Sequence, residues 1–276
     1  MESFFSFLEK RVDDSSSLLC VGLDPHVSDL SAPTAQAALD FSLNLVKQTS
    51  RYAAAFKPNA AFFEQFGAEG WTALKIVIEA IQDESNRLGS LIPVILDAKR
   101  GDISSTAEAY AKAAFETLGA HCITLSPYLG KDSIDPFLGH KEKGVFLLCK
   151  TSNPGAGDLQ DLEVASENSH PLYIHVAKLA ETWNTRNNIG LVVGATQTEA
   201  LARVRAAVPG LWFLAPGVGA QGGDLEVALK AGLRKDGKGM LIPISRGISR
   251  ADNPAHAAAD FRDEILNIKR KMAGHA

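Results

Sequence analysis

The sequence contains only three cysteines, Cys20, Cys122 and Cys149, and each lies within an apolar run. An odd number of cysteines does not suit a framework of disulfide bonds. We interpret them as reduced thiols of a hydrophobic core, which favours a cytoplasmic location. The cysteines and histidines also lack the spacing of a zinc site, so no metal is predicted.

Long apolar stretches and an excess of basic charge are absent as well. No segment approaches the roughly 20 apolar residues that cross a bilayer. Residues 1–10 are too short and too charged for a secretory signal, and we expect an amphipathic helix there. The formal net charge of −4 over 276 residues gives no general attraction for nucleic acid or anionic membranes. We therefore expect a soluble protein in which any site for an anionic ligand is local.

Short apolar runs alternate with longer helical patterns along the whole chain. This alternation predicts parallel strands joined by helices. Eight of each indicate a (β/α)₈ TIM barrel, with residues 1–276 forming a single domain and an extra helix at the N-terminus. The expected strands are 18–24, 53–58, 93–99, 121–127, 144–151, 189–194, 211–217 and 239–245. The expected helices are 34–51, 60–88, 105–118, 131–142, 170–184, 198–207, 224–231 and 254–271.

Local signals refine a few boundaries. Ser105 and Glu108 have the spacing of a capping box, and Asn253-Pro254 places proline at a first helical position. Residues 152–169 lack a clear period and are expected to form a loop.

Polar residues close several of the predicted strands. Asp24 ends the first strand, Lys57 the second, and Asp97 and Lys99 the third, while Ser152 follows the fifth. In a barrel these ends gather at the mouth that holds the active site. Any one of them has a structural alternative, such as a turn at Asp24 or a lysine stem packed under a solvated ammonium at Lys57. Burying two charges on one face of a strand costs desolvation free energy. For Asp97 and Lys99 we therefore favour a functional role over a structural one.

The last two strands are followed by a glycine-rich run, 217–223, and by Arg246-Gly247. Barrels often bind phosphate with these two loops. Backbone N–H groups beside glycine, the guanidinium of Arg246 and the amide of Gln221 are suitable donors to an anion. The alternative is a flexible turn with a surface cation, but both loops follow the expected strands, and we predict a phosphate site.

These residues together resemble the orotidine 5′-monophosphate decarboxylase family, specifically its longer bacterial-type subgroup. The resemblance covers nearly the whole chain and is carried by Asp97-Ala98-Lys99-Arg100-Gly101-Asp102-Ile103, Gly22-Leu23-Asp24, Phe56-Lys57-Pro58-Asn59, Ser152-Asn153-Pro154-Gly155, the run 216–223 and Arg246-Gly247. It implies decarboxylation of orotidine 5′-phosphate to uridine 5′-phosphate and CO₂, in de novo pyrimidine synthesis, with no cofactor.

The resemblance also implies roles for individual residues. Lys57, Asp97, Lys99 and Asp102 are similar to the family's catalytic tetrad, with Lys99 as proton donor to C6. Asp24 and Lys57 resemble its ribose-binding pair, Ser152 its pyrimidine-reading residue, and Gln221, Arg246 and Gly247 its phosphate-binding group. The family is homodimeric, and the resemblance places Asp102 and Thr106 in the partner's site. By local pattern alone, Asp102 could instead cap the following helix.

Three other functions remain open from the sequence. A metal-dependent 3-hexulose-6-phosphate synthase would use the same Asp-x-Lys-x-x-Asp scaffold with Mg²⁺. A Schiff-base aldolase would use Lys99 as a nucleophile, although its pairing with carboxylates disfavours the neutral amine. A sensor of phosphorylated nucleotides would need the phosphate loops but not Asp97 and Lys99.

Overall fold

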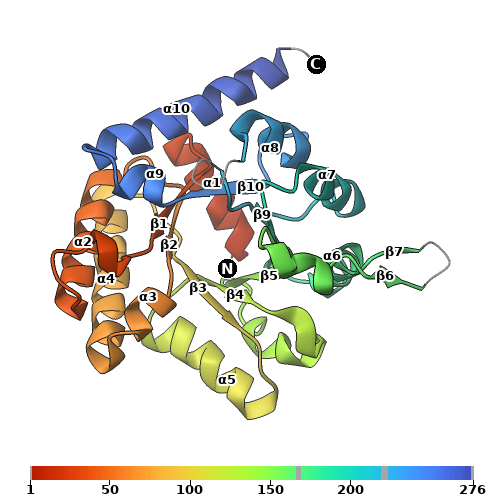
Figure 1. The fold of residues 1–276 in the computed structure, drawn as a ribbon, viewed down its shortest axis with the longest axis horizontal. Coiled ribbons are helices and arrows are strands. Elements are labelled where there is room, and N and C mark those ends of the chain that lie inside the picture. Colours follow the sequence, from red (N-terminus) through yellow and green to blue (C-terminus); the bar gives the residue numbers. More distant parts are fainter. Residues whose placement is uncertain (1, 166–168, 219–222, 275–276) are drawn as a thin grey trace.

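The computed structural model describes residues 2–165, 169–218 and 223–274. Within these ranges eight parallel strands form one sheet that is wrapped by helices (Figure 1). The strands are β1 (Leu19–Leu23), β2 (Ala55–Pro58), β3 (Ile95–Arg100), β4 (Cys122–Leu125), β5 (Gly144–Lys150), β8 (Ile189–Val193), β9 (Phe213–Leu214) and β10 (Met240–Ile244). Each of the eight predicted strands is therefore present, and each is shorter than expected.

The sheet closes into a barrel. Its order is β2-β1-β10-β9-β8-β5-β4-β3, and the outer strands β2 and β3 meet through parallel bridges at Phe56–Val94 and Asn59–Asp97. Hydrogen bonds support this closure, because Phe56 N–H donates to Pro93 at 2.9 Å and Ala60 N–H donates to Asp97 at 3.1 Å. The predicted (β/α)₈ barrel is confirmed.

The helices lie outside the barrel, apart from the first, which covers its end (Figure 1). They are α1 (Phe4–Ser15), α2 (Ala35–Thr49), α3 (Ala61–Glu64), α4 (Gly67–Leu88), α5 (Ser104–Lys112), α6 (Leu172–Trp183), α7 (Thr198–Ala207), α8 (Leu225–Gly232), α9 (Arg246–Ser249) and α10 (Pro254–Ala273). Two of the predicted helices differ from this pattern. The predicted helix 60–88 is divided into α3 and α4, and Gly67 at the break has a φ of +62°.

The predicted helix 131–142 is wrong. The chain forms two short 3₁₀ turns there, Lys131–Ser133 and Asp135–Phe137. Pro136 lies in the middle of the segment and has no N–H to continue a helical ladder.

The predicted capping box is also wrong, because α5 begins at Ser104 and places Ser105 inside the helix. Asp102 does not cap α5 either; its carboxylate accepts the adjacent Ile103 N–H at 2.8 Å. The predicted helix start at Asn253-Pro254 is confirmed, since Pro254 is the first residue of α10 and the Asn253 side chain accepts a hydrogen bond from His256 N–H at 3.0 Å.

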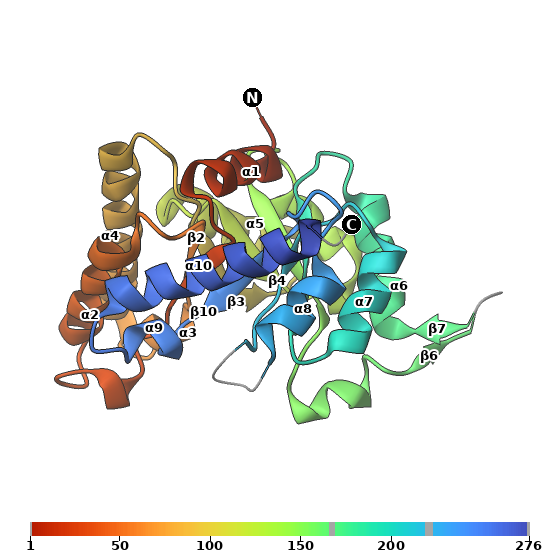
Figure 2. The same ribbon diagram turned by 90° about the horizontal axis from the view of Figure 1, so that it is seen from above.

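The segment 152–169, predicted as a loop, contains more structure than expected. A 3₁₀ turn covers Pro154–Asp158, and β6 (Glu163–Val164) pairs antiparallel with β7 (His170–Pro171). This hairpin projects beside α6, away from the barrel (Figure 2). A strand of two residues has no readable period, which is why sequence patterns do not reveal it.

Helix α1 lies at the barrel end opposite the carboxyl ends of the strands (Figure 2). Its Phe4, Phe5 and Leu8 are fully buried, and Phe5 stacks on Trp212 with ring centroids 6.1 Å apart. Full burial of such side chains is worth about 1.5–3 kcal/mol each, so α1 is part of the core.

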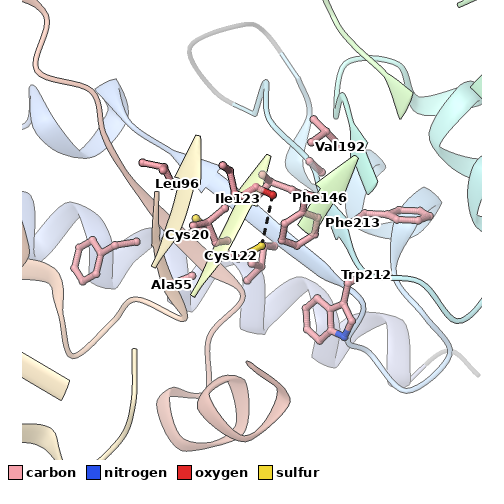
Figure 3. Close-up of a cluster of buried hydrophobic side chains, with 14 of the residues drawn as sticks. Cys20, Ala55, Leu96, Cys122, Ile123, Phe146, Val192, Trp212 and Phe213 are labelled. Atoms are coloured by element: carbon pink, nitrogen blue, oxygen red, sulfur yellow. Dashed lines mark hydrogen bonds between the residues drawn. The ribbon is translucent and has the colours of Figure 1, made fainter. Parts of the chain in front are cut away.

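The three cysteines are free and buried among apolar side chains inside the barrel wall, as Figure 3 shows for Cys20 and Cys122. Burial raises the pKa of Cys20 to about 12 and raises the pKa of Cys122 well above its usual value. The prediction of reduced core thiols is confirmed. Over the described ranges, no helix combines the length and apolar character needed to span a bilayer.

Candidate active site

A cavity of about 720 Å³ opens at the carboxyl ends of the barrel strands. It is lined by seven of the residues predicted from the sequence: Asp24, Lys57, Asp97, Lys99, Ser152, Arg246 and Gly247. They come from β1, β2, β3, β5 and β10 or the segments that follow these strands. The barrel therefore brings together, at one mouth, groups that are more than 200 residues apart.

Three predicted residues are not among those that line this cavity. Asp102 is only partly buried and Thr106 is exposed on α5. Neither is found in the lining given by the described residues of this one chain. Gln221 lies outside the described residues.

Strand β3 carries Asp97 and Lys99 on a bulge rather than on a regular strand. Its pairing with β4 steps from Leu96–Ile123 to Arg100–Leu125, so three intervening residues on β3 lie opposite one on β4. Lys99 has a φ of +47°, a left-handed conformation that costs a non-glycine residue roughly 1–2 kcal/mol. Both side chains face the cavity as predicted, although simple strand alternation is not the reason.

The cavity floor holds a row of alternating charges. Lys57 Nζ lies 2.8 Å from Asp97 Oδ2 and 3.9 Å from Asp24 Oδ1, and Lys99 Nζ lies 2.5 Å from Asp97 Oδ1. The side chains of Lys57 and Asp97 are 9% and 11% exposed, whereas that of Lys99 is 50% exposed. The Lys99 ammonium thus faces the open cavity, and the more deeply buried Asp97 carboxylate forms an ion pair with it.

The buried charges stabilise one another in their ionised forms. Burial alone would raise the pKa of Asp97, but Lys57 and Lys99 outweigh it and hold that pKa well below its usual range. Burial alone would lower the pKa of Lys57, but Asp97 and then Asp24 outweigh it and raise that pKa. Both groups are therefore charged at neutral pH.

Two polar atoms at this mouth are buried without a hydrogen-bond partner among the described residues: Asp24 Oδ1 and Ser245 Oγ. Buried acceptors and hydroxyls are rarely left unpaired, because each unmade bond costs about 1–3 kcal/mol. Asp24 and Ser245 also belong to the cavity lining. These atoms are consequently suited to bind polar groups of a ligand.

The backbone is closely packed where the cavity meets β10. A Cβ added to Gly22 would lie 2.8 Å from Ser245 Cβ, and one added to Gly247 would lie 3.1 Å from the Phe261 ring. On the neighbouring loop Gly217 has a φ of +111°, a conformation that favours glycine. Val218 and Gly223 form a bridge across the base of that loop. Because β9 and β10 are paired neighbours and residues after both strands line the cavity, the described parts of the two loops lie side by side at its mouth, as the sequence predicted.

Two cavity residues were missed by sequence reasoning. Thr124, on β4, donates to Asp97 Oδ1 at 3.0 Å, and Gln160 exchanges two hydrogen bonds of 2.8 Å with Thr151. The signal for Thr124 was present: it is a polar residue in the middle of an apolar run. Gln160 belongs to a segment without a period, so nothing in the sequence indicated its position.

The segment after β5 is fastened by a further contact. Lys150, with a side chain only 5% exposed, lies 2.6 Å from Asp161 and has its ammonium 5.6 Å from the centre of the Tyr173 ring. Together with Gln160 this ion pair holds residues 154–161 against the barrel beside Ser152. The edge of the cavity on this side is therefore built from ordered side-chain contacts.

Comparison with known proteins places this geometry in a family. The sequence profile of the family described as "Orotidine 5'-phosphate decarboxylase / HUMPS family" matches residues 17–261. The orotidine 5′-phosphate decarboxylase of Roseiflexus castenholzii is 48% identical over 271 residues, which cover 97% of this chain and 96% of that protein.

Solved structures are also similar to this chain. The OMP decarboxylase of Leishmania donovani has a TM-score of 0.86 and 54% identity, covering 97% of this chain and 98% of that one. The UMP synthase of the same organism has a TM-score of 0.89 and 55% identity, covering 98% of this chain and 57% of that longer one.

Proposed function

Because this chain belongs to the orotidine 5′-phosphate decarboxylase / HUMPS family, we propose that it is a carboxy-lyase that converts orotidine 5′-phosphate to uridine 5′-phosphate and CO₂. The observation that carries the proposal is the row Asp24, Lys57, Asp97 and Lys99 at the cavity floor. Relatives that match over nearly their full length are named orotidine 5′-phosphate decarboxylases, which supports this proposal. We further propose a single domain over residues 1–276, acting in pyrimidine synthesis in the cytoplasm.

The chemistry requires stabilisation of a carbanion. When the bond from C6 to the carboxylate breaks, CO₂ leaves and the electron pair stays at C6, in an orbital that the pyrimidine ring does not delocalise. A fixed positive charge near C6 stabilises that pair electrostatically. The ammonium of Lys99 supplies this charge without a cofactor, and it then donates its proton to C6. The neutral amine regains a proton from solvent, to which its side chain is half exposed.

Asp97 has two roles in this proposal. It holds the Lys99 side chain in position, since Asp97 Oδ1 lies 2.5 Å from Lys99 Nζ. It also lies beside the carboxylate of the substrate, where repulsion between like charges is relieved as CO₂ departs. Lys57 balances the negative charge of Asp97 from the other side, at 2.8 Å.

The ribose is assigned to Asp24 and Lys57. The unpaired Oδ1 of Asp24 is buried, and a ribose hydroxyl is a donor that would satisfy it. The Lys57 ammonium lies 3.9 Å from that oxygen, so one hydroxyl could donate to the carboxylate while accepting from Lys57.

The phosphate is assigned to the loops after β9 and β10. Arg246 and the backbone of Gly247 line this end of the cavity, and Gln221 is proposed to join them. Binding energy from the remote phosphate supports catalysis when it orients C6 against Lys99. Ser152, which follows Thr151 and its hydrogen-bond partner Gln160 in the cavity lining, is proposed to read the pyrimidine.

We propose that the protein is a homodimer in which Asp102 and Thr106 enter the partner's site. The surface around them supports this assembly, because Ile103, Tyr128 and Leu129 are 50%, 79% and 47% exposed. These apolar side chains follow the neighbouring strands β3 and β4, and exposed apolar surface of this kind is typical of protein interfaces. In the dimer Asp102 would give Lys99 a second carboxylate.

Turnover of orotidine 5′-phosphate, followed by ultraviolet absorbance, tests the function. We expect loss of substrate absorbance and formation of uridine 5′-phosphate in equal amounts with CO₂. Binding of uridine 5′-phosphate without turnover would indicate a sensor and refute the decarboxylase.

Two additional measurements separate the rival enzymes. Full activity after extensive treatment with a chelator is expected, and a loss that Mg²⁺ restores would contradict the cofactor-free mechanism. Borohydride should trap no adduct on Lys99 during turnover, since a trapped adduct would reveal a Schiff base.

A further inference from the structure

Thr124 lies beneath the bulge of β3, where it is 1% exposed. Its hydroxyl donates to Asp97 Oδ1 at 3.0 Å and accepts the N–H groups of Ala98 at 3.1 Å and Lys99 at 2.9 Å. A hydroxyl has one proton and two lone pairs, so all of its hydrogen-bonding capacity is used here. Thr124 therefore contacts both the carboxylate and the backbone of the residues that we assign to catalysis.

The bulge explains why a side chain is needed at this point. Between Leu96 and Arg100 the regular ladder with β4 is interrupted, which removes backbone acceptors from the intervening N–H groups. Thr124 Oγ1 replaces those acceptors for two consecutive residues. One of them is Lys99, whose left-handed backbone conformation must be held by its surroundings.

Asp97 is oriented by three donors from three strands. Lys57 on β2 binds Oδ2, whereas Lys99 on β3 and Thr124 on β4 both bind Oδ1. Of these three donors, Thr124 is the uncharged one. It is also the one whose side chain accepts hydrogen bonds from the backbone N–H groups of Ala98 and Lys99. It thus links the carboxylate of Asp97 to the backbone of the residue that carries the ammonium.

We propose that Thr124 is a positioning residue that sets the geometry of the Asp97–Lys99 pair toward the reacting carbon. The proposal rests on the decarboxylase function given above. Thr124 acts through Asp97 and Lys99, so it affects the chemical step and leaves the ribose and phosphate contacts in place.

The test compares Thr124→Val, which keeps the shape but removes the hydroxyl, with Thr124→Ser, which keeps the hydroxyl. We expect Thr124→Val to lower kcat about tenfold to a hundredfold, as is usual when a hydrogen bond to a charged group is lost. KM for orotidine 5′-phosphate and the Kd for uridine 5′-phosphate should change less than about threefold. Thr124→Ser should restore kcat to within about threefold of the parent.

A matched control is Thr49→Val. Thr49 is also fully buried, but its hydroxyl donates to Leu45 within α2, away from the cavity. This variant should keep the parental kcat. If Thr124→Val does not reach a folded state by circular dichroism, Thr124→Ala, which is smaller and cannot overpack the site, takes its place in the same comparison.

Three results would overturn the proposal. They are a kcat for the hydroxyl-free variant within about threefold of the parent, a Thr124→Ser variant no better than Thr124→Val, and an equal loss in Thr49→Val. Inactivity of the parent protein would instead refute the proposed function, so the two failures are distinguishable.

Discussion

Replacement of Asp97 by asparagine tests the electrostatics of the cavity floor most directly. The change keeps the size of the side chain but removes the charge between Lys57 and Lys99, which lie 2.8 Å and 2.5 Å away. Among the described residues, Lys57 would keep the more distant Asp24, at 3.9 Å, as its remaining ion-pair partner. Since the Lys57 side chain is 9% exposed, its ammonium would be left desolvated beside a weakly interacting carboxylate.

The expected cost follows from that burial. Breaking a buried ion pair by removing one partner costs about 3–5 kcal/mol, and the remaining attraction of Asp24 places the estimate near the lower end, about 3 kcal/mol. At roughly 2 °C for each kcal/mol in a protein of this size, Tm should fall by about 6 °C. Unfolding in urea at neutral pH, followed by circular dichroism, measures the change in free energy.

The pH dependence of the cost has a definite sign. Because the pKa of Asp97 is lowered in the folded state, its charge contributes stability that is fully present above the ordinary aspartate pKa of about 4. That contribution is lost progressively as pH falls below this value. The difference between parent and Asp97→Asn should therefore shrink in acid.

An exposed ion pair provides the control. Asp135 lies 2.6 Å from Lys131, but their side chains are 48% and 52% exposed, and Asp135→Asn should change stability by no more than about 0.5 kcal/mol. In a Lys57→Met background Asp97→Asn should cost less, with a coupling energy of about 1 kcal/mol or more. A cost no larger than that of Asp135→Asn, or no coupling to Lys57, would refute the reasoning.

Other residues give further expectations. Lys99→Ala should all but abolish decarboxylation in the absorbance assay, and activity within about tenfold of the parent, or roughly 1.4 kcal/mol, would contradict its role as proton donor. Arg246→Ala should lower kcat/KM for the nucleotide while leaving Tm unchanged, and an unchanged kcat/KM would remove it from the phosphate site. The three cysteines should react with a thiol reagent only on unfolding, because all are buried and the pKa of each is raised. Rapid labelling of the native protein at neutral pH would contradict their place in the core.

Much of the fold could be predicted because its signals are local. Buried parallel strands appear as short apolar runs, and the helices between them carry the period of an amphipathic face. The prediction of a helix over 131–142 was wrong because the apolar spacing of this segment is helical, whereas Pro136 interrupts the hydrogen-bond ladder. The β6–β7 hairpin was not predicted because each of its strands has two residues, which is too short to show a period of alternation.

Much of the candidate site followed from a topological rule. Asp24, Lys57, Asp97, Lys99 and Arg246 are strand-end residues, and a closed parallel barrel must bring such residues to one mouth. Their partners could not be read in the same way. Which acceptor meets which donor depends on the register between strands, and single residues do not specify that register.

The sequence by itself determined the number of barrel strands and their order along the chain, the burial of the cysteines and the set of charges at the barrel mouth. Each of these depends on residue type and on spacing along the chain. Only the tertiary structure decided the bulge that turns Lys99 toward Asp97, the hydroxyl of Thr124 beneath it and the unpaired oxygen of Asp24. These features arise where separate strands meet, and their energies depend on distances of a few ångströms that no pattern of residues records.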